Sequence, residues 1–107
     1  MNALKSNTTG GYNTASGYEA LGKNTTGNLN TAFGYEAGDV ITTGSNNVII
    51  GYGADPSANN ATNQIVIGKG ATGQGDNYAV IGNADVTRVY AAQDAGATLY
   101  AGGLNIG

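Results

Sequence analysis

Short apolar segments recur along this chain at a nearly constant spacing, and each of them ends just before a glycine. The most apolar ones occupy residues 48–50, 65–67 and 79–81 and consist of Val, Ile and Ala. Since β-branched side chains favour extended backbone, these segments predict β-strands. No segment has apolar residues at helical spacing over a helical length, so we predict an all-β protein. The five predicted strands cover residues 13–16, 30–33, 47–50, 64–67 and 78–81.

The glycines that follow these strands define a repeat. Glycine recurs every 17 residues from Gly17 to Gly68, and Gly82 follows after 14. A unit this short cannot bury an apolar face alone, so successive copies must stack. The sequence therefore predicts a parallel β-solenoid of about five rungs, where a rung is one repeat of 14–17 residues. We also expect a second short extended piece after each glycine, as at residues 18–20.

The strongest predicted strands are apolar on both faces. Side chains alternate along a strand, so Val48 and Ile50 share one face while Ile49 takes the other. This is the pattern of a strand that is buried on both sides. The solenoid interior covers one face, and a second copy of the chain is the simplest cover for the other. The residues assigned to the solenoid core or to the interface between copies are Phe33, Val48, Ile49, Ile50, Ile65, Val66, Ile67, Val80 and Ile81.

Composition excludes several kinds of function. Only 10% of the 107 residues are charged, the net charge is -3, and the four basic residues are scattered, which argues against a nucleic-acid partner. The chain has no Cys and no His, so zinc sites, thiol chemistry and Ser-His-Asp catalysis are excluded. No carboxylate pair has a spacing that indicates acid–base catalysis, and no apolar run is long enough for a membrane span. We therefore expect no enzymatic activity, no cofactor, no metal and no membrane insertion.

The repeat contains a motif that resembles a known family. The pattern N-x-[VI]-x-[IF]-G-x-x-A is approximated at residues 30–37, 46–54 and 63–71. It is similar to the head repeats of trimeric autotransporter adhesins of the YadA type, and the resemblance covers about residues 2–85. The resemblance implies a left-handed parallel β-roll, a homotrimer around a common axis, and an extracellular position on a bacterial cell or a virion fibre. It also implies a binding or spacer role rather than catalysis.

The repeat ends after Gly82, which divides the chain into head repeats over residues 1–85 and a C-terminal segment over residues 86–107. In this segment we expect a strand over residues 86–92, a turn, and a second strand over residues 97–101. Such a segment serves as a β cap that closes the open edge of the solenoid. The alternative is a receptor-binding tip. Tyr90 and Tyr100 are the candidate binding residues of such a tip. Because Met1 falls within a repeat, we also expect the chain to be a fragment of a longer protein.

Two ladders of like residues are candidate surfaces. Tyr18, Tyr35 and Tyr52 recur at the repeat spacing. They form either a stripe that binds a carbohydrate or another surface, or a packing contact between rungs or subunits. We favour the packing contact. Pairs of threonines recur at residues 8–9, 25–26 and 42–43. They form either an ice-binding array or ordinary turns in which the hydroxyl bonds to the backbone, and we favour the turns.

We therefore expect a non-enzymatic adhesive or structural segment of a trimeric surface fibre. Its partners would be two further copies of the chain and a glycan or protein on a host or prey cell. The alternatives are a receptor-binding segment of a bacteriophage tail fibre and, from a different class, an ice-binding solenoid. The sequence does not name the receptor, the source, or the domains on either side.

Overall fold

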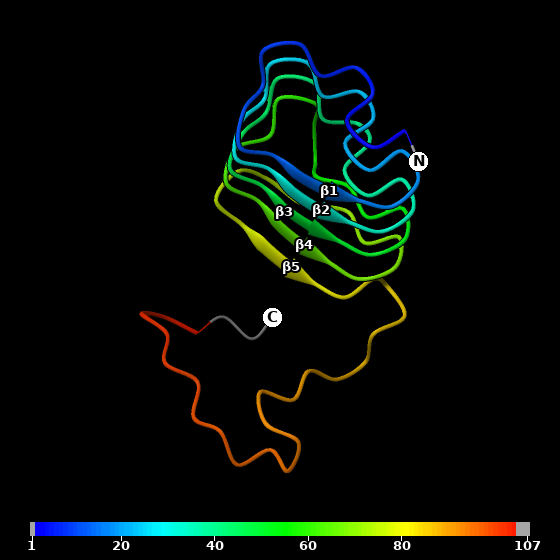
Figure 1. Ribbon diagram of the computed structural model, residues 1–107. Coiled ribbons are helices and arrows are strands. Elements are labelled where there is room, and N and C mark those ends of the chain that lie inside the picture. The colour runs from blue at the N-terminus through cyan, green and yellow to red at the C-terminus, as the bar shows by residue number, and fades with distance from the viewer. Residues whose placement is uncertain (1, 105–107) are drawn as a thin grey trace.

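The computed structural model describes residues 2–104 and places five strands in one parallel sheet (Figure 1). Each strand pairs with the next one along the chain, so the sheet order is the sequence order. The chain winds through about four turns of a β-solenoid, and no helix occurs in the described part. The prediction of an all-β parallel solenoid is therefore confirmed. The strands are β1 (Thr14–Ser16), β2 (Thr31–Phe33), β3 (Val48–Ile50), β4 (Ile65–Ile67) and β5 (Ala79–Ile81).

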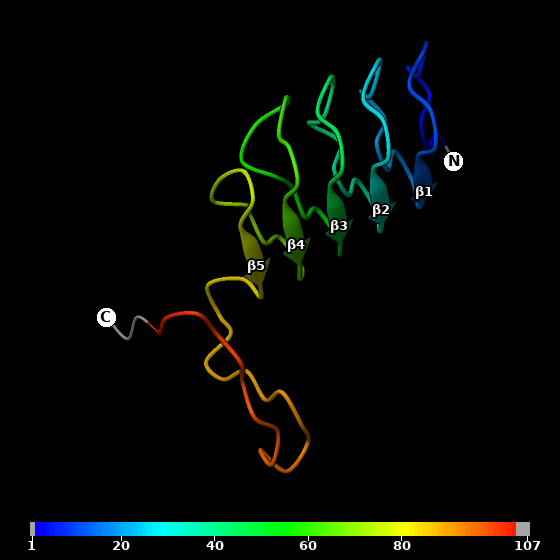
Figure 2. The ribbon, with the colours of Figure 1, turned by 90° about the vertical axis from the view of Figure 1, so that its left-hand side faces the viewer.

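The repeat spacing sets the register of the sheet. Thr14 pairs with Thr31, which pairs with Val48, so equivalent residues lie directly above one another. In the shorter last repeat Ile65 pairs with Ala79, 14 residues further on. The same residues of β4 and β5 therefore still face the core and the outside. Figure 2 shows the strands as successive tiers of one stack. Each strand residue therefore has the equivalent residue of the neighbouring strand as its cross-strand partner.

The middle residue of each strand points into the solenoid. Ile49 and Val66 are fully buried there, whereas Val80 in the last strand is half-buried. Leu21 and Ile41 enter the same core from the turns. The other inward positions are small, because a coil this narrow leaves little room between its walls. Alanine fills them at Ala20, Ala32, Ala37, Ala54 and Ala71.

A ladder of amide side chains runs beside the strands. Asn47 is fully buried, its Oδ1 accepts from the backbone N–H of Gln64 at 2.9 Å, and its Nδ2 donates to the carbonyl of Ala61 at 2.8 Å. The Oδ1 of Asn30 accepts from the N–H of Asn47 in the same way, at 3.1 Å. Each amide thus satisfies backbone groups of the following rung that water cannot reach, which a buried backbone requires.

The ladder ends at Gln64, where the repeat shortens. Its Oε1 accepts from the N–H of Ser57 at 3.0 Å, and its Nε2 donates to Ser57 Oγ at 2.7 Å and to Asp76 Oδ1 at 3.0 Å. Asp76 Oδ1 also accepts from the N–H of Thr62 at 2.9 Å. These bonds from Thr62 and then Gln64 hold the pKa of the Asp76 carboxyl below its usual value, because they favour the charged form.

The expected second extended piece at residues 18–20 is a tight turn instead. The N–H of Ala20 donates to the carbonyl of Gly17 at 3.1 Å, and Glu19 has a φ of 56°. The chain has to turn sharply at this corner of the solenoid, over residues 17–20, so that the side chain of Ala20 points into the core. Glycine is required at the start of the corner, because a Cβ on Gly34 would lie 2.7 Å from the carbonyl oxygen of Gly51 in the next rung.

The C-terminal segment leaves the stack after β5 and extends away from it (Figure 1, Figure 2). The strands expected over residues 86–92 and 97–101 do not form in the described residues, so that prediction was wrong. The physical reason is that no second strand lies beside either segment to complete a ladder. Residue 1 of the predicted head and residues 105–107 of the predicted C-terminal segment lie outside the described residues.

Candidate functional site

The outer face of the sheet is an exposed apolar stripe. The first and third residues of each strand point outward, away from the core that contains Ile49 and Val66. From β2 to β5 these outward residues are mostly large and apolar, whereas in β1 they are Thr14 and Ser16. Val48 and Ile67 are half-buried, and the exposed members are Phe33 (45%), Ile50 (37%), Ile65 (39%) and Ile81 (60%). Contiguous exposed apolar surface of this kind marks an interaction site.

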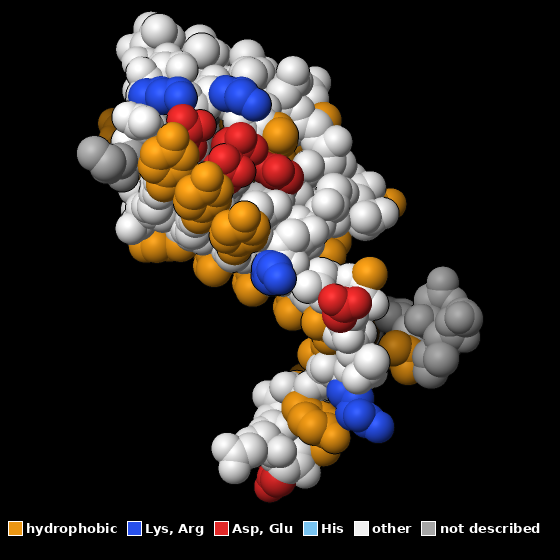
Figure 3. All heavy atoms as spheres, turned by 90° about the vertical axis from the view of Figure 1, so that its right-hand side faces the viewer, with side chains coloured by type: hydrophobic (Ala, Val, Ile, Leu, Met, Phe, Trp, Pro, Cys, Tyr) orange, Lys and Arg blue, Asp and Glu red, His pale blue; other side chains and the backbone are white. Residues whose placement is uncertain are grey.

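The three repeat tyrosines stack on one another. The ring centroids of Tyr18 and Tyr35 are 5.1 Å apart with an interplanar angle of 15°, and those of Tyr35 and Tyr52 are 5.2 Å apart with an angle of 13°. Figure 3 shows a row of hydrophobic side chains that crosses successive rungs beside acidic ones. Because both faces of the Tyr35 ring are covered by its neighbours, a sugar cannot stack on that ring. The stacking leaves Tyr18, Tyr35 and Tyr52 partly exposed, at 41%, 43% and 59%.

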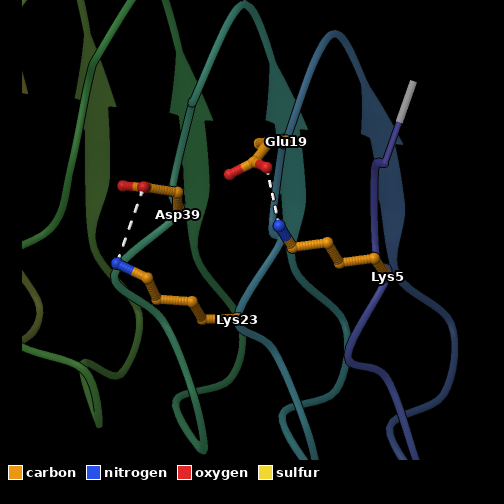
Figure 4. A network of polar contacts seen from close by, with 4 residues as sticks. All are labelled: Lys5, Glu19, Lys23 and Asp39. Carbon is orange, nitrogen blue, oxygen red and sulfur yellow. Dashed lines mark hydrogen bonds and ion pairs between the residues drawn. The ribbon is translucent and has the colours of Figure 1, made fainter.

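Two ion pairs join lysines to carboxylates of the solenoid (Figure 4). Lys5 Nζ lies 2.6 Å from Glu19 Oε1, and Lys23 Nζ lies 3.8 Å from Asp39 Oδ2. The hydrogen bond to Glu19 raises the pKa of Lys5 above its usual value. Exposed pairs such as these contribute little to stability, because water and salt screen them. Their main effect is to place positive charge beside two of the carboxylates.

Asp55 is a carboxylate whose pKa is raised by its surroundings. Its Oδ1 is buried and, among the described residues, has no hydrogen-bond partner. Burial raises the pKa of Asp55 from 3.8 to about 6, and the negative charge of Asp39 adds to the effect. Within residues 2–104 no group of three or more His, Cys, Asp or Glu side chains could hold a metal ion.

One threonine of each pair in the ladder bonds its hydroxyl within the stack. Thr8 Oγ1 donates to the carbonyl of Thr25 at 3.0 Å, Thr25 Oγ1 donates to that of Thr42 at 3.1 Å, and Thr42 Oγ1 to that of Asn59 at 3.5 Å. An array that recognises ice has to present its hydroxyls to water. The hydroxyl protons of these three threonines are directed along the stack, as the turn interpretation expects. The second threonines of the pairs, Thr9, Thr26 and Thr43, are exposed.

Tyr90 and Tyr100 lie on the C-terminal segment, where they are 63% and 91% exposed. Tyr90 lines a shallow apolar concavity together with Val89 and Leu99, and Tyr100 does not. The structure therefore does not bring these two tyrosines into one site with each other, nor with the stacked row on the solenoid.

The ion pairs and the environment of Asp55 were missed by the sequence analysis. Both involve residues that are not separated by a whole repeat: Lys5 and Glu19 are 14 positions apart, while the rungs there repeat every 17. A periodic alignment compares equivalent positions, so it carries no signal for contacts between different positions.

Comparison with known protein families, with curated proteins and with solved structures finds no match for this chain. The described residues include no helix that is long and apolar enough to cross a membrane.

Proposed function

We propose that this chain is a non-enzymatic segment of a trimeric surface fibre, and that the outer face of its sheet packs against two further copies around a common axis. The observation that carries the proposal is the exposed apolar stripe from Phe33 to Ile81, on a fold whose interior is already filled. Parallel sheets are normally covered on both faces, and here the outer face is covered only if another copy packs against it.

The geometry of the stripe favours a closed assembly. The two outward positions of each strand are separated by about 7 Å, so the stripe is narrow and runs along the stack. Copies related by rotation about an axis parallel to the stack can each turn such a stripe inward. The number three and the left-handed winding come from the resemblance to the YadA-type head repeats.

As part of such a fibre, the segment either presents a binding surface to another cell or holds one away from the anchor. We propose an extracellular position and a glycan or protein on a host or prey cell as the partner. A bacteriophage tail fibre is the second candidate, since the same stack serves there. An ice-binding solenoid is less favoured, because one threonine hydroxyl of each pair bonds to a carbonyl of the next rung and is not free to order water.

The assembly is tested by sedimentation velocity of the purified chain at micromolar concentration, where we expect a trimer. Ile50→Asp or Ile67→Asp places a charge in the proposed interface, which should weaken association by about 3–5 kcal/mol. Ile49→Ala is the matched control, because Ile49 is fully buried inside each solenoid and does not reach the proposed interface. It should lower the stability of the fold, so the assembled fraction should fall only as far as the folded fraction does. A folded wild-type monomer at that concentration would refute the proposal.

The adhesive role is tested separately, with the assembled chain on a glycan array and on bacterial cells. Tyr90→Ala and Tyr100→Ala remove the two exposed rings of the C-terminal segment and should reduce any binding that this segment provides. If a trimer forms but binds no surface, the spacer role is retained and the adhesive role is refuted.

A further inference from the structure

The stacked tyrosines form a surface at which neighbouring phenol rings are held together. Tyr18, Tyr35 and Tyr52 are 41%, 43% and 59% exposed, so dissolved reagents reach their ring edges. Their spacing is set by the backbone: the carbonyl of Tyr18 accepts from the N–H of Glu36 at 2.7 Å, and that of Tyr35 from the N–H of Gly53 at 2.8 Å. These bonds between rungs keep the backbones of neighbouring tyrosines at a fixed separation.

We propose that this row is an oxidative cross-linking site, in which a carbon–carbon bond between the rings of neighbouring tyrosines joins one rung covalently to the next. The co-reactant is hydrogen peroxide, used by a haem peroxidase. The two available pairs are Tyr18 with Tyr35 and Tyr35 with Tyr52, and the middle ring belongs to both.

The reaction balances without any further reagent. Each of two tyrosines loses one electron and its phenolic proton to the peroxidase and becomes a neutral tyrosyl radical. The two radicals couple at ring carbons adjacent to the hydroxyl-bearing carbons, and the hydrogens on those carbons then move to the oxygens to restore both phenols. Two ring C–H bonds are replaced by one C–C bond, and the peroxide O–O bond is cleaved and reduced to two water molecules.

The row differs from the other tyrosines in having preformed partners. Among residues 2–104, Tyr12, Tyr78, Tyr90 and Tyr100 have no stacked aromatic neighbour, so no partner ring is held in place for their radicals. Coupling within the row is unimolecular and does not depend on the protein concentration. It is also independent of the trimer, because both rings of each pair belong to one chain.

The consequence is a covalent staple in a chain that has no cysteine. A bond between Tyr18 and Tyr35 closes a loop of 17 residues, the separation of the two positions in the sheet register. A cross-link of this kind restricts the unfolded chain as a disulfide does, so the midpoint of thermal unfolding should rise.

The experiment treats dilute purified chain with horseradish-type peroxidase and hydrogen peroxide, and then digests it with trypsin. Cleavage after Lys5, Lys23, Lys69 and Arg88 separates Tyr18 from Tyr35 but leaves Tyr35 and Tyr52 in one peptide, residues 24–69. We expect dityrosine fluorescence, a covalent link between peptides 6–23 and 24–69, and a form of peptide 24–69 that lacks two hydrogens.

Two variants decide the assignment. Tyr35→Phe keeps the stacking but removes the shared phenol, and it should lose nearly all of the intrachain product. Tyr12→Phe removes the other tyrosine of peptide 6–23, and it should retain the product because Tyr12 has no stacked partner. Circular dichroism that matches wild type establishes that both variants are folded. Intrachain product that survives Tyr35→Phe would overturn the proposal, as would the absence of dityrosine while a free tyrosine peptide in the same mixture couples.

Discussion

The buried amide ladder offers a quantitative test of how the rungs are joined. In Asn47→Ala, the N–H of Gln64 loses its acceptor at 2.9 Å, and the carbonyl of Ala61 loses a donor at 2.8 Å. The N–H of Gln64 then has no replacement acceptor, because the site of Asn47 is closed to water. An unsatisfied buried donor costs about 1–3 kcal/mol, and the lost bond to the carbonyl adds about 1 kcal/mol. We expect the free energy of unfolding to fall by about 3 kcal/mol.

Asn13→Ala is the matched control, because Asn13 occupies the same position in the first rung. It makes the equivalent bonds, from the N–H of Asn30 at 2.9 Å and to the carbonyl of Gly27 at 2.8 Å. Asn13 is half-buried rather than fully buried, so water can replace part of these bonds when the side chain is removed. The expected loss is about 1 kcal/mol or less.

Equilibrium urea unfolding, followed by circular dichroism, measures both variants together with Asn30→Ala. Asn30 is fully buried and should behave like Asn47 rather than Asn13. Including it separates burial from position in the stack, since an end rung can also fray. Equal losses for Asn47→Ala and Asn13→Ala would refute the reasoning, because the loss would then not depend on burial of the amide.

Two further perturbations address the corner and the perturbed carboxylate. Gly34→Ala should lower the unfolding free energy by about 3 kcal/mol, through the contact with Gly51 and a φ of +133°. Gly53→Ala, with φ +61° and open space around its Cβ, should lower it by about 1 kcal/mol, and equal losses would contradict the contact. The folded state binds a proton on Asp55 more tightly than the unfolded chain does. Stability from this group is therefore complete below pH 3.8 and is lost as pH rises through about 6. Asp55→Asn should remove that decline in urea unfolding measured between pH 4 and 7, and an unchanged profile would exclude Asp55 as its source.

Much of the fold could be predicted because the repeat encodes its own contacts. Where glycine and the β-prone triplets return at equal spacing, the equivalent strands pair in register, as β1 and β2 do. The alternation within Val48–Ile50 likewise predicted that Ile49 lies on the opposite face from Val48 and Ile50, and the structure shows that the face of Ile49 is the core. The trimer, the adhesive role and the binding residues remain predictions.

The wrong predictions concern segments whose conformation depends on a neighbour. Residues 86–92 and 97–101 contain β-prone side chains, but a strand needs a second strand beside it, and the described C-terminal segment has none. Residues 18–20 were expected to be extended, yet the chain has to turn there to bring Ala20 into the core. Local propensity does not contain either constraint.

The sequence by itself determined the period, the strand positions, the parallel order and the two apolar faces. Each of these follows from regularities along the chain, because stacked rungs place equivalent residues on top of one another. Only the tertiary structure decided that the tyrosine rings cover each other's faces, that one threonine hydroxyl of each pair bonds to a carbonyl, and that one oxygen of Asp55 is buried without a partner. These features depend on side-chain rotamers and on the path of each corner. A one-dimensional repeat does not specify them.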